Sequence, residues 1–129
     1  MGKKLNRIML VDDESQIHPI VQLALEGLGG FEVMSCTSGE EAIQKAPAFR
    51  PDLVLVDVMM PEMDGIETLS ALRGLPPLQD TDYAFFTGRT APKDLQTYES
   101  LGALGTIEKP FDPLKLAEEV QVLWSKAGH

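Results

Sequence analysis

Residues 53–56 read Leu-Val-Leu-Val, a run that is apolar at every position and is followed at once by Asp57. A strand with one solvated face alternates apolar and polar residues, so an unbroken apolar run predicts a central strand buried on both faces. Strands of that kind occur mainly in parallel sheets that helices cover on both sides. This run therefore constrains the chain to an α/β fold in which Asp57 stands at the end of a buried strand.

Other apolar stretches favour further strands, and amphipathic stretches separate them. We expect strands at residues 7–11, 31–35, 53–57, 83–87 and in a short segment just before Lys109. Apolar residues at helical spacing predict the intervening helices. The first helix has Ile17, Ile20, Val21, Ala24 and Leu28 on its inner face, and the last has Leu116, Ala117, Val120, Leu123 and Trp124. These units predict one domain over residues 1–129, with its core at about 6–126, built on a single five-stranded parallel sheet, doubly wound as (βα)5.

Local signals predict where several helices begin and end. Gly29-Gly30 ends the first helix. Polar residues suited to capping free backbone N–H groups predict three helix starts. They are Ser38 with Glu41, Asp64 with Glu67, and Asp112 with Pro113 at the first helical position.

A few other residues favour plain structural roles. We expect Trp124 and Tyr98 to pack, and Leu95 to share a face with Tyr98 on a helix over residues 92–101. His18 is expected to be a surface or first-turn residue rather than a phosphate donor.

Composition excludes several classes of partner and site. The net charge of −9 argues against binding nucleic acid or an anionic membrane, since both attract basic surfaces. Cys36 is the only cysteine, so an intrachain disulfide and a cysteine-rich zinc site are excluded, and we expect it to be a small buried hydrophobe. A reducing, cytoplasmic location fits this cysteine usage. The apolar run near the N-terminus is too short for a signal peptide, and no segment is long enough to span a bilayer.

Polar side chains stand where the predicted strands end. Asp12 and Asp13 follow the first strand, Asp57 the third, Thr87 closes the fourth and Lys109 follows the fifth. The carboxyl ends of parallel strands share one edge of the sheet, where ligands bind. Three carboxylates, a hydroxyl and an ammonium would converge there. Such a set suits Mg²⁺ and a phosphoryl group.

Four segments, in this order, carry a family resemblance. They are Val-Asp-Asp-Glu at 11–14, Val-Asp-Val-Met-Met-Pro-Glu-Met-Asp-Gly at 56–65, Phe-Thr-Gly at 86–88 and Glu-Lys-Pro-Phe at 108–111. Together they resemble the CheY-like receiver domain of bacterial two-component response regulators, and the similarity covers nearly the whole chain. The resemblance implies a flavodoxin-like fold and a signalling module rather than a conventional enzyme.

The resemblance also implies a role for each acid. Asp57 would accept a phosphoryl group from the phosphohistidine of a histidine kinase. Asp13 and Asp57 would ligate Mg²⁺ directly together with the backbone carbonyl of Met59, and Asp12 would act mainly through water.

The remaining site residues and the partners follow from the same resemblance. Thr87 would move toward the phosphoryl group, Lys109 would pair with it, and the Lys109–Pro110 bond would be cis. The partners would be a sensor histidine kinase or phosphotransfer protein, and a downstream protein or fused output domain. The output partner would bind the face made by the fourth helix, fifth strand and fifth helix.

The chain departs from the receiver pattern three residues before Lys109. Receivers usually place an aromatic there that swings inward when the threonine moves, whereas this chain has Thr106. We expect phosphorylation to change the output face less than usual, or to change it through backbone shifts of residues 88–91. Met59 and Arg89 occupy positions that border the path of the hydrolytic water, and Arg89 would either pair with the phosphoryl group or crowd it.

Two other functions remain open from the sequence. A Mg²⁺-dependent phosphatase or mutase also uses an aspartate nucleophile, but such enzymes generally need a second aspartate two positions later, where this chain has Met59. A degenerate receiver would act as a constitutive binding module, and the complete set of acids, threonine and lysine argues against it.

Overall fold

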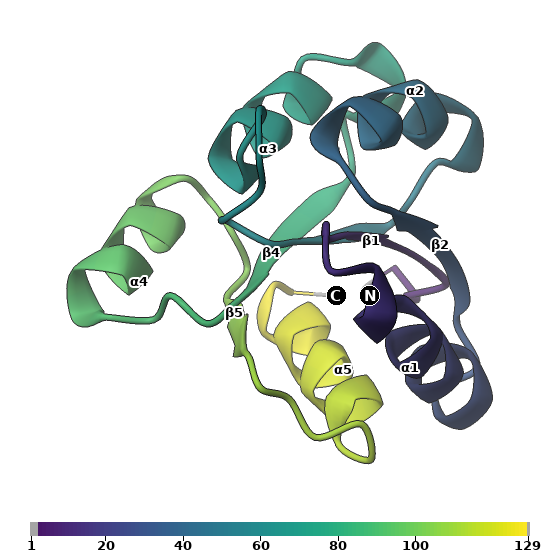
Figure 1. The fold of residues 1–129 in the computed structure, drawn as a ribbon. Helices are drawn as coiled ribbons and strands as arrows, with labels where there is room; N and C mark the ends of the chain where they lie inside the picture. Colours follow the sequence, from purple (N-terminus) through teal and green to yellow (C-terminus); the bar gives the residue numbers. More distant parts are fainter. Residues whose placement is uncertain (1–2, 129) are drawn as a thin grey trace.

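The computed structural model describes residues 3–128, which form a five-stranded parallel sheet with helices on both faces (Figure 1). The strand order is β2-β1-β3-β4-β5. The strands are β1 (Arg7–Val11), β2 (Glu32–Cys36), β3 (Leu53–Val56), β4 (Asp82–Thr87) and β5 (Thr106–Glu108). This architecture confirms the predicted doubly wound (βα)5 class. The second strand begins and ends one residue later than predicted.

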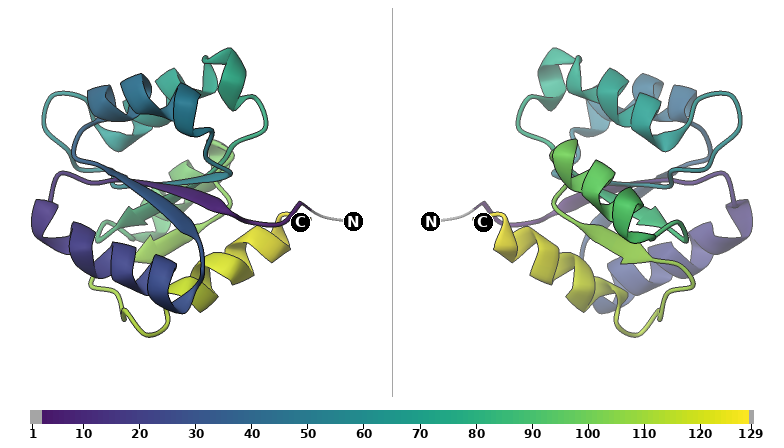
Figure 2. Two further views of the ribbon diagram at one scale, coloured as in Figure 1. Left: turned by 90° about the vertical axis from the view of Figure 1, so that its right-hand side faces the viewer. Right: turned by 90° about the vertical axis from the view of Figure 1, so that its left-hand side faces the viewer.

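Helices α1 and α5 cover one face of the sheet, and α2, α3 and α4 pack on the other (Figures 1 and 2). The α-helices are α1 (His18–Gln22), α2 (Gly39–Phe49), α3 (Gly65–Arg73), α4 (Pro92–Ser100) and α5 (Leu116–Lys126). Shorter 3₁₀ turns are η1 (Ser15–Ile17) and η3 (Pro76–Leu78), and the π-helical η2 (Leu23–Leu28) continues α1. None of the helices in residues 3–128 combines the length and apolar composition that crossing a bilayer requires.

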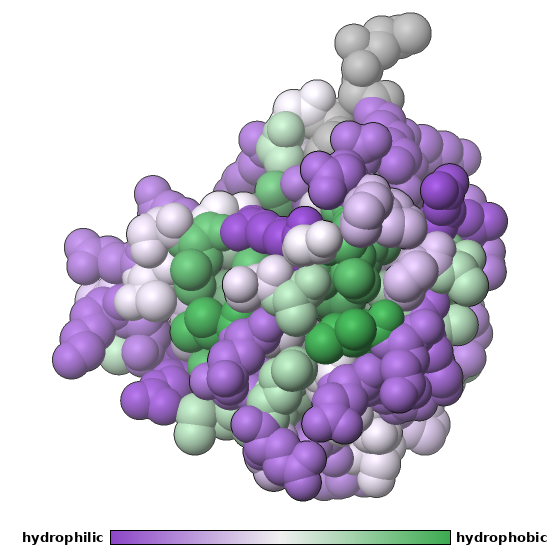
Figure 3. Space-filling model, turned by 90° about the horizontal axis from the view of Figure 1, so that it is seen from above, coloured by the Kyte–Doolittle hydropathy of each residue, from purple (hydrophilic) through white to green (hydrophobic). Residues whose placement is uncertain are grey.

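The sheet separates two apolar clusters, because successive side chains of a strand point to opposite faces. In β3, Leu53 and Leu55 pack toward α1 and α5, whereas Val54 and Val56 pack toward α2, α3 and α4. All four are fully buried, which explains why the run carries no polar residue. On the outer face of α2 and α3, hydrophilic residues surround hydrophobic ones that show between them (Figure 3).

The first helix differs from the predicted one. Ile20 and Leu28 were expected on its inner face, but 47% of Ile20 and 63% of Leu28 is exposed, while Leu25 is buried. Leu28 lies in the π-helical η2, whose wider turn displaces it from the α-helical stripe. Ile20 lies in α1, before η2, at the margin of the apolar stripe. The predicted stop is confirmed, since Gly30 adopts a positive φ and the Phe31 N–H donates to the Leu25 carbonyl.

Of the two capping boxes predicted for α2 and α3, one is complete and the other is only partly formed. Asp64 and Glu67 form a complete capping box at the start of α3. Ser38 accepts from the Glu41 N–H as predicted, but the Glu41 carboxylate accepts from the Thr37 N–H instead of closing the box.

The predicted start of the last helix is wrong. The Asp112 carboxylate accepts from the Leu114 N–H within a turn, at 2.9 Å, and α5 begins only at Leu116. A short aspartate side chain that closes a local turn competes with helix capping at the same position.

Three packing predictions are confirmed. Cys36 is fully buried, and burial, with a smaller contribution from the charge of Glu41, raises the pKa of its thiol to about 12. Trp124 and Tyr98 are buried as well. Leu95, however, is 41% exposed and does not share the burial of Tyr98.

Asp52 joins β1 to β3 at the edge of the sheet opposite the strand ends discussed above. Its buried carboxylate accepts the N–H groups of Asn6 (3.0 Å) and Arg7 (2.8 Å) and pairs with Lys3 at 2.9 Å. Burial would raise the pKa of Asp52, but the Arg7 N–H, the Lys3 ammonium and the Asn6 N–H outweigh it and lower that pKa.

We expect Asp52→Asn to lower the free energy of unfolding at neutral pH by about 1–2 kcal/mol, because it weakens hydrogen bonds to a charged group. The Asp52 pKa is lower in the folded than in the unfolded state, so this stabilisation is present above about pH 4 and is lost as pH falls through the folded-state pKa. Urea unfolding at neutral and acidic pH measures it, with Asp80→Asn, at an exposed position, as control. An equal difference between wild type and Asp52→Asn at both pH values contradicts this assignment.

Candidate functional site

The carboxyl edge of the sheet brings the predicted site residues together. Asp12 and Asp57 directly follow β1 and β3, Thr87 ends β4, and Lys109 directly follows β5. The strand hydrogen bonding continues past the strand ends, because the Asp57 N–H donates to the Val11 carbonyl and the Lys109 N–H to the Thr87 carbonyl, each at 3.0 Å. The backbone of the site is thus held by the sheet.

The start of α3 fits closely against the end of β3. A Cβ at Gly65 would overlap the backbone carbonyl of Asp57, and the Gly65 N–H donates to the Val58 carbonyl at 2.9 Å. Only glycine permits this approach. The capped start of α3 therefore helps to hold the turn that carries Asp57.

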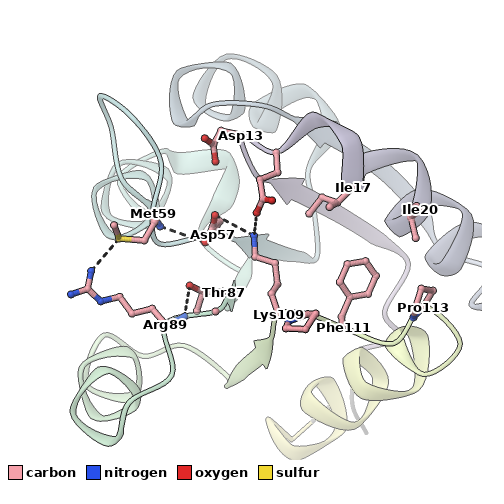
Figure 4. A pocket seen from close by; sticks show the side chains of 13 residues that line it. Asp13, Ile17, Ile20, Asp57, Met59, Thr87, Arg89, Lys109, Phe111 and Pro113 are labelled. Carbon is pink, nitrogen blue, oxygen red and sulfur yellow. Dashed lines mark hydrogen bonds and ion pairs between the residues drawn. The ribbon is translucent and has the colours of Figure 1, made fainter.

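The Lys109 ammonium lies among three carboxylates, of which Figure 4 labels Asp57. Its Nζ donates to Asp12 Oδ2 and Glu14 Oε1, each at 2.8 Å, and to Asp57 Oδ2 at 3.3 Å. Asp12 is fully buried and Asp57 is 5% exposed, so water screens these two charges little. One ammonium therefore offsets part of the like-charge repulsion at this edge.

The pKa shifts reflect burial and this ion pairing. Burial raises the pKa of the Asp12 carboxyl, and the hydrogen bonds from Lys109 and the Glu14 N–H oppose it only in part. Burial would lower the pKa of Lys109, but its bonds to Asp12 and Glu14 outweigh burial and raise that pKa. Lys109 is accordingly a permanent cation at physiological pH.

The acids at this edge form a donor set that suits a hard cation. One carboxylate oxygen from each of Asp12, Asp13 and Asp57 lies within 4.8 Å of the others. Asp13 is exposed, whereas the other two are buried. An all-oxygen set of this kind fits Mg²⁺, which retains some of its waters at such sites. Met59, whose carbonyl was predicted as a ligand, lies at the same rim, and its N–H donates to Asp57 Oδ1 at 3.4 Å.

A cavity of about 910 Å³ opens over Asp57, between the rim of the sheet and the first turn of α1 (Figure 4). Thr87, buried at one side, accepts the Arg89 N–H on its Oγ1 at 3.1 Å. The Arg89 guanidinium contacts the Met59 sulfur at 3.1 Å and lies 3.7 Å from the Asp94 carboxylate. Arg89 and Met59 therefore border the approach to Asp57, as their predicted positions require.

Two contacts were not predicted from the sequence. Glu14 lay within a quoted motif but was given no role, and it supplies one of the three acceptors of Lys109. His18 is the first residue of α1, as expected of a first-turn residue, but it is buried. Its Nε2 donates to the Asp12 carbonyl at 2.6 Å and so ties the helix to the site. The Lys109–Pro110 bond is cis, as the resemblance implied.

The fold and this edge define a doubly wound α/β domain of the class used in two-component signalling. Residues 8–121 match the family described as response regulator receiver domain, and the chain belongs to that family.

Relatives carry the same domain in different proteins. The chain is 35% identical over 123 residues to the alkaline phosphatase synthesis transcriptional regulatory protein PhoP of Bacillus subtilis. The match covers 95% of this chain and 49% of that protein. It is also 33% identical over 112 residues to protein-glutamate methylesterase/protein-glutamine glutaminase 3 of Rhodospirillum rubrum. This second match covers 87% of this chain and 30% of that protein. The chain thus spans about half or less of the length of these curated relatives.

Solved structures agree with the fold. Chemotaxis protein CheY4 of Vibrio cholerae superposes with a TM-score of 0.84 at 32% identity, covering 93% of this chain and 99% of that one. This chain therefore matches part of some longer proteins and nearly the whole of this solved chain.

Replacing Lys109 should reveal how far it offsets the buried acids. We expect Lys109→Met to lower the free energy of unfolding by about 3 kcal/mol, because the buried Asp12 carboxylate loses its cation. Glu14→Gln removes the exposed partner of the same ammonium and should cost under about 1 kcal/mol. Urea titrations without Mg²⁺ measure the free energy of unfolding of both variants. Equal losses would show that the burial of Asp12 does not determine how much Lys109 stabilises the fold.

Proposed function

We propose that this chain is a phosphoacceptor signalling module that receives a phosphoryl group on Asp57 in the presence of Mg²⁺. The observation that carries the proposal is the nearly buried Asp57 carboxylate, which lies next to a lysine ammonium and to two further aspartates. A carboxylate so placed is a nucleophile next to positive charge that can neutralise the transferred group.

The transfer would exchange one bond to phosphorus for another. An Asp57 oxygen attacks the phosphorus of a phosphohistidine, an acyl phosphate forms, and the nitrogen–phosphorus bond breaks with its electron pair returning to the imidazole. Asp13, Asp57 and the Met59 carbonyl would hold Mg²⁺, with Asp12 acting mainly through water. When bound, the cation would neutralise phosphoryl oxygens.

Lys109 and Thr87 would receive the phosphoryl oxygens. All three N–H bonds of the Lys109 ammonium are in use, and the one to Glu14 is the most exposed. Exchanging that bond for a phosphoryl oxygen would leave the buried Asp12 paired. The Thr87 hydroxyl, at the end of the next strand, would donate to another phosphoryl oxygen.

An apolar groove beside the site supports a protein as the phosphate donor. Ile20 lines both the cavity over Asp57 and a neighbouring groove formed by residues of α1, η2 and the turn before α5. Leu23 and Leu114 in that groove are 72% and 79% exposed. Apolar surface joined to the site suits docking of a histidine kinase or phosphotransfer protein.

The output partner and the location are further parts of this proposal. We infer that a downstream protein or a fused output domain reads the face made by α4, β5 and α5, that this domain does not itself bind nucleic acid or membrane, and that it works in the cytoplasm. The relatives named above support an output domain in a longer protein, since the match covers only 49% of one and 30% of the other.

A phosphatase of the aspartyl-phosphate type is the second candidate. The exposed Met59 side chain occupies the position where such an enzyme carries its second acid, and Arg89 lies against it. A thioether cannot act as an acid or base. Sustained hydrolysis of phosphomonoesters by the purified protein would revive this candidate.

Acetyl phosphate, a small phosphodonor, tests the proposal directly. With Mg²⁺ we expect intact-mass spectrometry to show uptake of one phosphoryl group, abolished by chelating the metal and by Asp57→Asn. Asp112→Asn, an exposed acid at the same edge, is the matched control and should label normally. Unchanged labelling of Asp57→Asn would refute Asp57 as the acceptor.

Mg²⁺ should also stabilise the folded chain. Binding to the native state alone adds about 2.7 kcal/mol to the free energy of unfolding when the ion is at a hundred times its dissociation constant. We expect urea unfolding to show this gain for the wild type and to show most of it lost in Asp13→Asn, which alters an exposed residue. The same gain in both proteins would place the cation elsewhere.

A further inference from the structure

Helix α4 places an aromatic side chain next to the small residue Thr106. Thr106 pairs in register with Phe85 of β4, and the Tyr98 ring packs on Phe85 with their centroids 4.4 Å apart. Tyr98 and Thr106 line one cavity of about 330 Å³. The aromatic ring that packs on Phe85 therefore comes from α4, whereas β5 places Thr106 beside Phe85.

The Tyr98 hydroxyl is bonded to the loop that follows Thr87. Its Oη donates to the Arg89 carbonyl at 2.8 Å, and Tyr98 is only 2% exposed. The N–H of the same residue, Arg89, donates to Thr87 Oγ1 at 3.1 Å. Two hydrogen bonds thus connect the hydroxyl of Thr87, through the backbone of Arg89, to the side chain of Tyr98.

We propose that Tyr98 takes the place of the missing aromatic at position 106 and transmits the state of Asp57 to α4 through the Arg89 carbonyl. This inference rests on the proposed function, because it needs a phosphoryl group on Asp57. Tyr98 is a positioning residue, since it lies outside the site and acts through Arg89 and Thr87.

A movement of Thr87 would reach Tyr98 because the hydrogen bonds of Arg89 to both residues are kept. The Thr87 hydroxyl donates its proton to a phosphoryl oxygen while its oxygen still accepts the Arg89 N–H, so Arg89 follows Thr87 toward Asp57. The buried Tyr98 hydroxyl loses its bond unless it follows the Arg89 carbonyl, and an unpaired buried hydroxyl is unfavourable.

Helix α4 is suited to respond because it is weakly anchored. Tyr98 is the one residue of Pro92–Ser100 that is buried. The other link from Arg89 to this helix is the 3.7 Å approach to Asp94, in which the Arg89 side chain is 55% exposed. Exposed ion pairs of this kind contribute little. The position of α4 on the sheet therefore depends chiefly on Tyr98.

Tyr98→Phe separates signal transmission from packing. The variant keeps the ring on Phe85 and removes only the hydroxyl bond to Arg89. Tyr83→Phe is the matched control, because Tyr83 is the only other tyrosine and its buried hydroxyl has no hydrogen-bond partner among the described residues. Each protein is loaded with Mg²⁺ and beryllofluoride, a mimic of the phosphoryl group. Amide hydrogen exchange across residues 92–100 then reports on α4.

In the wild type and in Tyr83→Phe we expect beryllofluoride to change the exchange of α4 by about fivefold or more, the lower range of allosteric coupling. In Tyr98→Phe the change in α4 should be lost, while beryllofluoride binding and phosphoryl uptake at Asp57 stay as in the wild type. A full α4 response in Tyr98→Phe overturns this inference, as does a wild type that binds beryllofluoride with no response in α4. Both results leave the proposed function standing, whereas a wild type that takes up neither group removes both proposals.

Discussion

The site depends on one ammonium group shared among three carboxylates. Asp12 and Asp57 are buried side by side at the carboxyl edge of the sheet, an arrangement that is unfavourable for like charges unless a cation lies between them. Lys109 is that cation. The neighbouring acids also form an oxygen donor set for a metal ion. The same electrostatics that hold the resting site together therefore prepare it to receive a cation and a phosphoryl group.

The proposed phosphoryl site lies on rigid strands, whereas helix α4, which we expect to respond to it, is weakly anchored. Asp12 and Asp57 directly follow β1 and β3, two neighbouring interior strands of the sheet, and every side chain of β3 is fully buried. Thr87 ends the next strand and is followed by a loop that leads into α4, the helix with a single buried residue. We therefore expect a change at Asp57 to leave β1 and β3 in place and to shift α4.

The sequence predicted the strand ends well, because a buried parallel strand needs an apolar run and the polar residue after it marks the edge. It failed where side chains meet across long separations or where helical winding changes. The bond from Lys109 to Glu14 joins residues 95 positions apart. The π-helical turn of η2 exposed Leu28 against its periodicity. Asp112 satisfied a local turn instead of a helix start, and the hydroxyl bond of Tyr98 left no periodic signal.

A crystal structure of the chain with Mg²⁺ and beryllofluoride would show whether Asp57 is the phosphoryl acceptor. We expect a beryllium atom bonded to an Asp57 oxygen and Mg²⁺ bound by Asp13, Asp57 and the Met59 carbonyl. We also expect Lys109 to leave Glu14 for a fluoride and to keep its bond to Asp12. Mg²⁺ and beryllofluoride bound away from Asp57 would rule out this role of Asp57, and a Lys109 that still contacts Glu14 and no fluoride would rule out the role proposed for Lys109.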